Sequence, residues 1–248
     1  MEPVTVSFSR DDNLDAPVLI EGLPGIGHVG KLVADHLIDE LEGEMIAEIS
    51  SLHFPPQVVV DEQGVTHLVN NKVYRSEKNG KAVLFLVGDF QSSSAPGHYI
   101  LTERYLDIAE SLGVRRIYAL GGYGVGHLVE NPRVLSAVNM ERLRPEVEAA
   151  GGSFENAGSE GVIVGASGLL LGLGEVRGIE GICLMGETSG YIADPKSADN
   201  LLSVLSRLLG IEVDHTSLQQ RAGEMEQLIA RVREAEEAKG REELSYIG

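Results

Sequence analysis

A glycine-rich turn at residues 25–30 has the residue types and spacing of a loop that binds phosphate. Its letters, GIGHVG, fit the G-x-G-x-x-G pattern, in which glycines let the backbone approach a pyrophosphate at a helix N-terminus. We therefore take Gly25, Gly27 and Gly30 as a candidate anion pocket. The letters nearly form a P-loop with Lys31, but Leu32 stands where that motif needs serine or threonine for Mg²⁺. Close packing of a helix on a strand explains the glycines more simply, and we favour that interpretation.

Acidic and histidine side chains in loops after expected strands are the other candidates for chemistry: Asp89, His98, His127, Glu187 and Asp194. The carboxyl ends of strands form the usual ligand edge of an open α/β sheet, where such groups could act as acids or bases. No pair of them has a spacing that fixes a role, and the seven histidines lack a metal-binding pattern such as H-E-x-x-H. The sequence therefore predicts no catalytic residue, no metal site and no cofactor.

Alternating strand and helix patterns position these loops and indicate an α/β fold. An apolar run over 18–20 precedes the glycine turn, and apolar residues then recur every four positions from Val29 to Leu41, as in an amphipathic helix. Further strands are expected at 4–8, 44–50, 58–61, 65–74, 82–87, 115–120, 134–138, 161–164 and 181–185. Further helices are expected at 97–112, 142–150, 168–174, 195–209 and 214–239, and a second glycine-rich turn at 121–126.

A tight turn and a continuous apolar run predict how two of these strands are placed. The dipeptide Asn79-Gly80 is typical of a tight hairpin and joins 65–74 to 82–87. The run 82–87 is apolar throughout, so we expect a central strand that is covered on both faces. The single cysteine, Cys183, lies in another apolar run and is expected to be a buried thiol.

Composition limits the class of protein. The chain has 248 residues, of which 43% are hydrophobic, which suffices for one large α/β domain. Its 38 acidic against 20 basic residues give a net charge of −18, and this charge disfavours a nucleic-acid partner. The N-terminus does not resemble a signal peptide, and no apolar run reaches the length of a membrane span. We therefore expect a cytoplasmic protein without a membrane partner.

The C-terminal region is expected to be separate from the core, with an α/β domain over 1–212 and a helix with a flexible tail over 213–248. The helix carries apolar residues at heptad spacing: Leu218, Ala222, Met225, Ile229 and Val232. These apolar residues are suited to pack either on a helix of a partner or on the α/β domain of the same chain. The tail ends in Leu244, Ser245, Tyr246, Ile247 and Gly248, which form either a frayed end or a docking peptide.

Several segments together resemble the proteasome assembly chaperone family, in its archaeal branch. The segments that carry the likeness are EGLPGIGHVGKLVADHLI from Glu21, HFPP from His53, FLVGDFQ from Phe85, YALGGYGVG from Tyr118, GASGLLLG from Gly165 and GETSGYIADPKSA from Gly186. The resemblance covers residues 16–212. It implies a mixed sheet flanked by helices, similar to nucleoside phosphorylases, in a homo-oligomer.

The resemblance also implies a function, which is to help proteasome core α subunits assemble or to bind the finished core. Characterised relatives dock through a C-terminal hydrophobic-tyrosine-any tripeptide. Here Tyr246 is third from the end, one position earlier than in that motif, and Ser245 precedes it. Leu244, Tyr246, Ile247 and Gly248 are the residues that we expect to bind a partner. The alternative is an enzyme or binder that acts on a nucleoside or a phosphorylated small molecule. A third possibility is a structural oligomer held by the heptad seam.

Overall fold

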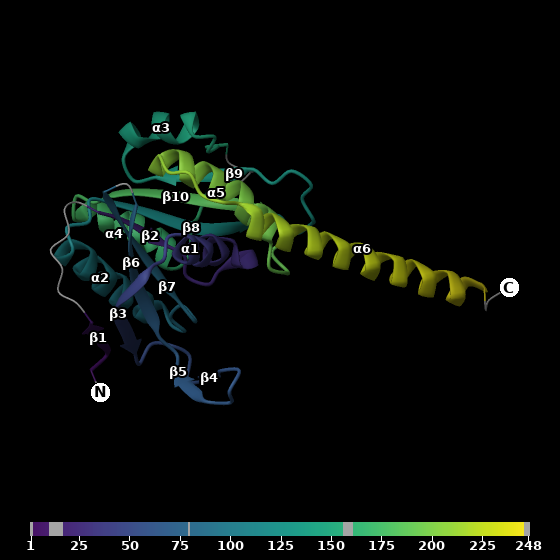
Figure 1. Cartoon of the computed structure of the whole chain (residues 1–248), viewed down its shortest axis with the longest axis horizontal. Coiled ribbons are helices and arrows are strands. Elements are labelled where there is room, and N and C mark those ends of the chain that lie inside the picture. The colour runs from purple at the N-terminus through teal and green to yellow at the C-terminus, as the bar shows by residue number, and fades with distance from the viewer. Residues whose placement is uncertain (1, 10–16, 79, 156–160, 246–248) are drawn as a thin grey trace.

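An eight-stranded mixed sheet forms the centre of the computed structural model, which describes residues 2–9, 17–78, 80–155 and 161–245. The strand order is β1-β3-β6-β7-β2-β8-β10-β9 (Figure 1). The strands are β1 (Val4–Phe8), β2 (Val18–Glu21), β3 (Glu44–Ser51), β6 (Asn71–Lys78), β7 (Lys81–Gly88), β8 (Arg116–Gly124), β9 (Val134–Val138) and β10 (Glu180–Thr188). The four neighbours β7, β2, β8 and β10 run parallel, and the outer strands are antiparallel to their neighbours.

Helices cover both faces of this sheet. One face carries α1 (Val29–Glu40), α3 (Arg144–Ala149) and α5 (Pro195–Leu209), and the other carries α2 (Ala95–Ser111) and α4 (Ala166–Val176). Short 3-10 helices at Ile26–His28 and Glu141–Leu143 lead into α1 and α3. The expected α/β class, with a mixed sheet flanked by helices, is thus confirmed.

The central strand β7 contributes side chains to the hydrophobic cores on both faces of the sheet. Val83 and Phe85 belong to the core under α1 and α5, whereas Leu84 and Leu86 belong to the core under α2. All four side chains are buried. The prediction of a central strand covered on both faces is therefore confirmed, since an apolar run without alternation is what two buried faces require. Register pairs Lys78 of β6 with Lys81, as a two-residue hairpin demands.

The expected strand at 65–74 is wrong as a single element. The chain instead forms β5 (Thr66–Leu68), which pairs only with β4 (Val58–Val60) in a separate ribbon that hangs away from the main sheet (Figure 1). Strand β6 then begins at Asn71. The break falls where Val69 turns inward to a buried position and the Asn70 carbonyl accepts a hydrogen bond from the Asp89 amide.

Two further predictions at the glycine-rich segments are wrong. Residues 121–124 do not turn but continue β8, which stays paired with β10 as far as Gly124 and Thr188. A β-carbon on Gly122 would lie 2.1 Å from the Ile26 carbonyl oxygen, so this glycine serves close packing rather than a turn. Residues 161–164 form no strand, and Val162 and Val164 are 79% and 82% exposed there.

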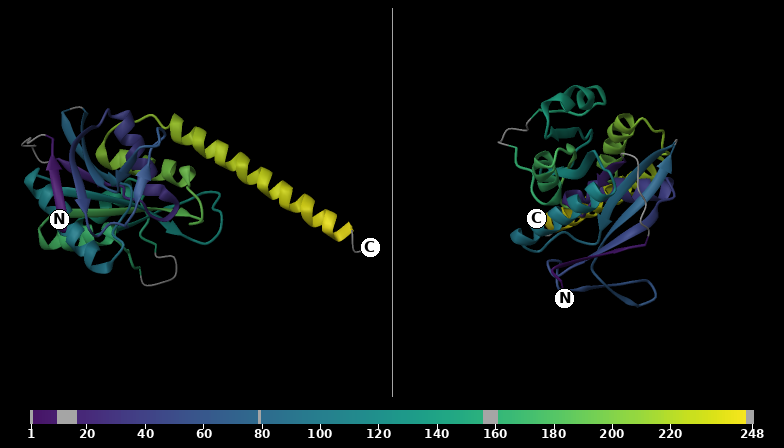
Figure 2. Two further views of the ribbon diagram at one scale, coloured as in Figure 1. Left: turned by 90° about the horizontal axis from the view of Figure 1, so that it is seen from below. Right: turned by 90° about the vertical axis from the view of Figure 1, so that its left-hand side faces the viewer.

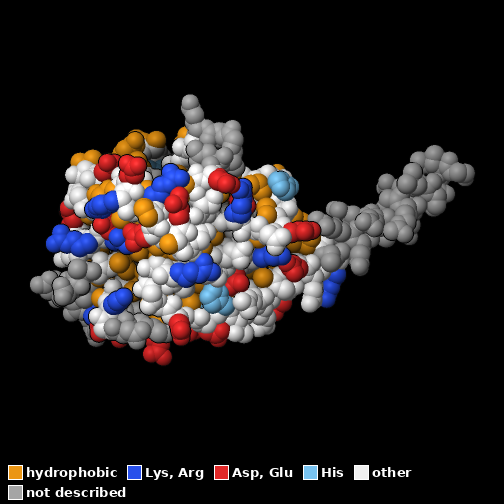
Figure 3. Space-filling view, turned by 90° about the horizontal axis from the view of Figure 1, so that it is seen from above, with side chains coloured by type: hydrophobic (Ala, Val, Ile, Leu, Met, Phe, Trp, Pro, Cys, Tyr) orange, Lys and Arg blue, Asp and Glu red, His pale blue; other side chains and the backbone are white. Residues whose placement is uncertain are grey.

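The last helix, α6 (Thr216–Ser245), packs on α5 at its beginning and then extends away from the body (Figure 2). It begins two residues later and runs six residues further than the sequence predicts. Of the heptad residues, Leu218 is fully buried, while Ala222, Met225 and Ile229 are half-buried. The division of the chain at residues 212 and 213 stays a prediction. On the face shown in Figure 3, basic side chains are dispersed among acidic ones.

Candidate functional site

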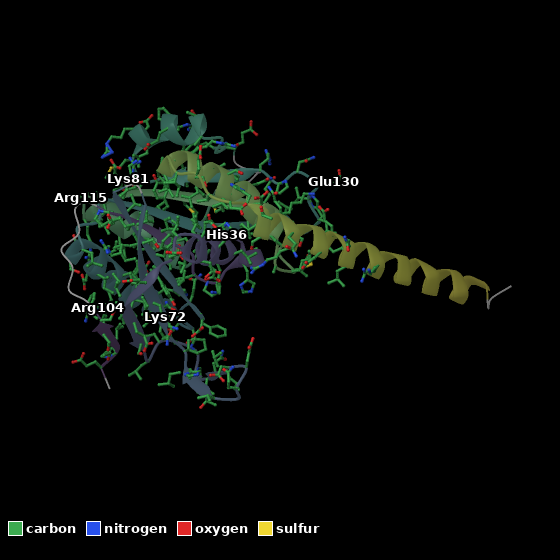
Figure 4. All side chains as sticks on the ribbon, in the orientation of Figure 1. His36, Lys72, Lys81, Arg104, Arg115 and Glu130 are labelled. Carbon is green, nitrogen blue, oxygen red and sulfur yellow. The ribbon has the colours of Figure 1, made fainter. Side chains whose placement is uncertain are left out.

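The carboxyl ends of the parallel strands define one edge of the sheet. Lys81, which begins β7, and Arg115, just before β8, lie at the opposite edge, whereas Glu130, after β8, lies on the side toward which α6 extends (Figure 4). The turn that follows β2, the start of α4 and the second half of β8 meet at the carboxyl edge. Open α/β sheets usually bind their ligands there.

The glycine turn after β2 is packed tightly against neighbouring strands. Gly27 has a φ of +62°, and a β-carbon on it would lie 2.8 Å from the Thr188 hydroxyl oxygen. A β-carbon on Gly30 would lie 2.2 Å from the Leu120 carbonyl oxygen. The Gly27 carbonyl also accepts a hydrogen bond from the Asp194 amide, at 2.9 Å. These two glycines therefore allow close approach of α1 to β8 and β10, and phosphate binding at the turn stays a prediction.

Gly25, the third glycine of the candidate anion pocket, lines a cavity of about 570 Å³ at the same edge. The cavity lies between the turn at 23–26, residues 120–124 of β8, the segment 162–165 and the first turn of α4. Three polar side chains that reach it come from different elements: Gln91, His98 and Ser167. The structure thus brings Gly25 and His98, but not Gly27 or Gly30, to this cavity.

A buried carboxyl group that the sequence analysis missed lies beside the cavity. Glu21 ends β2 and is fully buried; its Oε1 accepts a hydrogen bond from the Leu23 amide at 3.0 Å, and its Oε2 accepts one from the Ser167 hydroxyl at 2.8 Å. Burial raises the pKa of Glu21 to about 7, although both hydrogen bonds favour the charged form. The signal in the sequence was a charged residue directly after the apolar run VLI.

The Gln91 side chain forms hydrogen bonds to two walls of the cavity. Its amide nitrogen donates to the Pro24 carbonyl oxygen at 2.9 Å, and its amide oxygen accepts from the Ala166 backbone nitrogen at 3.0 Å. The glycine turn and the start of α4 are therefore held at a fixed separation. Partial burial lowers the pKa of His98, which favours the neutral imidazole.

The other candidate side chains have structural partners away from the cavity. Asp89 accepts a hydrogen bond from the Asn70 amide, and Asp194 caps α5 by accepting from the Ser197 amide at 3.0 Å. Glu187 forms an ion pair with Arg133 at 2.6 Å, which lowers the pKa of Glu187. A ring nitrogen of His127 lies 3.1 Å from the Val125 carbonyl oxygen. His127 lies near enough to Glu187 to contribute to this lowering of its pKa, but each of the four groups is bound to its own structural partner.

Cys183 is buried in β10, as predicted, and burial raises the pKa of its thiol well above the ordinary range. Across the described part of the chain, no three histidine, cysteine or acidic side chains are grouped closely enough to hold a metal ion. Within the same residues, no helix combines the length and the apolar composition needed to cross a membrane.

The predicted partner-binding tail begins at the end of α6. Leu244 and Ser245 belong to the last turn of that helix. Tyr246, Ile247 and Gly248 lie outside the described residues. At the other end of the helix, Lys196 of α5 forms an ion pair with Glu226 at 2.7 Å, and His215 lies 2.5 Å from the Asp199 carboxylate. These contacts fix the base of α6 to the body.

The fold and this edge of the sheet define a class of protein. The model of the PAC2 family matches residues 19–233, and the chain belongs to that family. The resemblance to the proteasome assembly chaperone family is thereby confirmed.

Individual relatives match nearly the whole chain. An uncharacterized protein of Methanocaldococcus jannaschii is 39% identical over 99% of this chain and 97% of its own length. The crystal structure of Pyrococcus furiosus PbaB, an archaeal proteasome activator, superposes with a TM-score of 0.89 at 37% identity and covers 94% of this chain and 100% of PbaB. Pyrococcus furiosus PbaA, an archaeal homolog of proteasome-assembly chaperone, gives a TM-score of 0.79 at 27% identity over 99% and 98% of the two chains.

Proposed function

We propose that this chain is a proteasome assembly chaperone or activator that binds core α subunits through its C-terminal tail. Membership of the PAC2 family and the 37% identity to a proteasome activator support the general role. The observation that carries the proposal is the geometry of α6. A helix of 30 residues spans about 45 Å, so Ser245 at the end of α6 lies well beyond the body that anchors the helix.

The anchoring of α6 fits such a role. Leu218 is buried against the core under α5, and the ion pair of Lys196 with Glu226 adds a second attachment about two turns further along. The helix thus has a fixed direction at its base and projects beyond it (Figure 2). In the proposed binding mode, a helix with a fixed base brings the residues that follow Ser245 to a partner at a lower cost in conformational entropy than an unstructured linker would.

The chemistry of the tail suits capture between subunits. A tyrosine offers a large apolar ring and a hydroxyl, and a free carboxylate can be held by lysine or by backbone amides of the partner. Tyr246 supplies the ring and the hydroxyl. Leu244 and Ile247 supply further apolar area on either side.

A pull-down with purified core α subunits tests the proposal. The full chain is compared with a variant that lacks residues 246–248 and with the variant Tyr191→Ala. Tyr191 is 80% exposed on the body, so its substitution is a matched loss of a surface tyrosine. The full chain and Tyr191→Ala are expected to retain the α subunits, and the truncated chain is expected to lose them. Equal retention by all three, or by none, contradicts the proposal.

Assembly into a homo-oligomer is a further part of the proposal. The half-buried heptad residues Ala222, Met225 and Ile229 lie beside Leu128 and Ile192 in a groove between α6 and the body. Light scattering of the full chain and of a chain that lacks residues 214–248 tests this part. A mass of one chain in both cases contradicts it.

A further inference from the structure

The cavity at the carboxyl edge of the sheet has the dimensions of a small-molecule site. Its volume of about 570 Å³ falls within the range of about 300–1,000 Å³ typical of ligand pockets. It lies at the edge where open α/β sheets bind ligands, and the Gln91 hydrogen bonds to Pro24 and Ala166 hold its walls in place. These hydrogen bonds hold the turn after β2 in place relative to the start of α4.

The walls of the cavity are mainly apolar or bare backbone. Apolar side chains from three segments face it: Leu23, Ile26, Ile163 and Met185. Gly121 contributes only backbone, and a β-carbon there would touch nothing closer than the Met185 side chain, at 3.8 Å. Tyr123 adds an aromatic ring. Flat, apolar ligand surfaces fit such walls, and an aromatic ring favours stacking on a heterocycle.

The charges at the cavity argue against an anionic ligand. None of the residues lining it within the described part of the chain is lysine or arginine, and the one titratable cation, His98, is shifted toward its neutral form. Gly27 and Gly30, whose amides would hold a phosphate, pack against β10 and β8 instead. A phosphate placed here would lose its hydration without an opposite charge in return.

The polar groups at the cavity suit an uncharged ligand with a few hydrogen-bonding atoms. The Ser167 hydroxyl donates its proton to Glu21, so its oxygen lone pairs remain able to accept a hydrogen bond from a ligand. The His98 ring, in its neutral form, offers one donor and one acceptor. These groups can orient a ligand that lies against the apolar walls.

We propose that this cavity binds an uncharged small molecule of nucleoside class, with a flat heterocyclic body and hydrogen-bonding groups, and that it rejects the phosphorylated form. Ser167 and His98 supply the hydrogen bonds, Tyr123 and the apolar walls hold the heterocycle, and the Gly121 backbone lets it lie close to β8. This proposal does not rest on binding to the proteasome.

Thermal unfolding of the full chain tests the proposal. The probes are adenosine, inosine and uridine, each compared with its 5′-monophosphate and with inorganic phosphate. At least one nucleoside is expected to raise the melting temperature, because a ligand that binds only the folded state stabilises it. Its monophosphate and free phosphate are expected to give no shift. The proposal is overturned if no nucleoside gives a shift or if a monophosphate gives an equal one.

Two glycine substitutions test whether the nucleoside binds in this cavity. Gly121→Leu places a side chain in the cavity without a clash at its β-carbon and is expected to abolish the nucleoside shift. Gly172→Leu is the matched control, because Gly172 is exposed on α4 and a β-carbon there meets nothing within 4 Å. If Gly121→Leu does not fold, Val164→Trp at the exposed cavity wall takes its place. A nucleoside shift that survives in the blocking variant, or disappears in the control, contradicts the assignment.

Discussion

The Ser167 hydroxyl donates a 2.8 Å hydrogen bond to the Glu21 carboxyl group, which joins two residues that lie 146 positions apart in the chain. Glu21 ends the central strand β2, and Ser167 lies in the first turn of α4. The contact fixes the start of α4 above the sheet and places a buried titratable group behind Ser167, which lines the cavity. The environment of Glu21 therefore links the stability of the fold to pH.

Stability is predicted to fall as the pH rises, through Glu21. The folded chain raises the pKa of this carboxyl group from its ordinary value of 4.5 to about 7, so the folded state binds the proton more tightly than the unfolded state. This contribution is fully present below pH 4.5 and is lost as the pH rises to about 7. Linkage gives a loss on the order of 3 kcal/mol.

The variant Glu21→Gln isolates this effect, because the amide has the same shape and does not titrate. Urea unfolding of both chains at pH 5 and pH 8 gives the two free energies of unfolding. Between these pH values the wild-type chain is expected to lose more stability than the variant, by roughly 2–3 kcal/mol. The same pH dependence in both chains would show that Glu21 does not titrate in this range.

Gly30→Ala is predicted to destabilise the fold. The new β-carbon would lie 2.2 Å from the Leu120 carbonyl oxygen, so α1 must move away from β8. Overpacking of this kind costs about 1–3 kcal/mol and can cost more. The matched control is Gly172→Ala in α4, where the β-carbon meets nothing and helix propensity predicts a gain of roughly 0.5–1 kcal/mol. Chemical denaturation measures both, and a neutral Gly30→Ala would contradict the packing role of this glycine.

Asp194→Ala is predicted to weaken the start of α5. The Asp194 side chain accepts a hydrogen bond from the Ser197 amide, and its loss leaves a backbone donor at the helix end without that partner. Loss of such a cap costs about 1 kcal/mol of unfolding free energy. Asp194→Asn keeps a cap acceptor and is expected to stay close to the wild type. Equal destabilisation by both variants in urea unfolding would mean that the carboxylate charge, not the cap, is what stabilises the fold.

Much of the fold could be predicted because its signals are local. The apolar run of β7, the four-residue spacing in α1 and the Asp194-Pro195 start of α5 each depend on nearby residues, and the structure confirms them. The glycines of β8 gave a misleading signal. Position 122 needs glycine because a β-carbon there would clash with the Ile26 carbonyl oxygen of a distant turn. No local pattern distinguishes such a glycine from one in a loop.

The cavity was harder to predict than the sheet edge on which it lies. Its position follows from strand order, and Gly25 and His98 were expected near this edge. The pairing of Glu21 with Ser167, however, depends on how β2 and α4 meet in space. Asp89 and Glu187 had the residue types of a site but proved to bind Asn70 and Arg133. Residue type alone did not distinguish the side chains that lie at the cavity from those that only bind structural partners.

Removal of Gly248 is predicted to tighten binding to the proteasome core. In the docking tripeptide that the family resemblance implies, the tyrosine is second from the end, and this deletion moves Tyr246 to that position. The carboxylate then lies at the distance from the ring that the partner pocket is expected to accept. Competition binding against the full chain measures the change. Weaker binding by the shortened chain would show that the pocket accepts the longer spacing of this protein.

The affinity of the intact chain for the assembled core, measured with and without the Tyr246 ring, tests the central claim most directly. Tyr246→Ala is expected to weaken equilibrium binding by about 1–3 kcal/mol, as for a buried interface anchor, while Tyr191→Ala on the body leaves it unchanged. The claim is contradicted if Tyr246→Ala binds as tightly as the wild type, or if the wild-type chain does not bind the core.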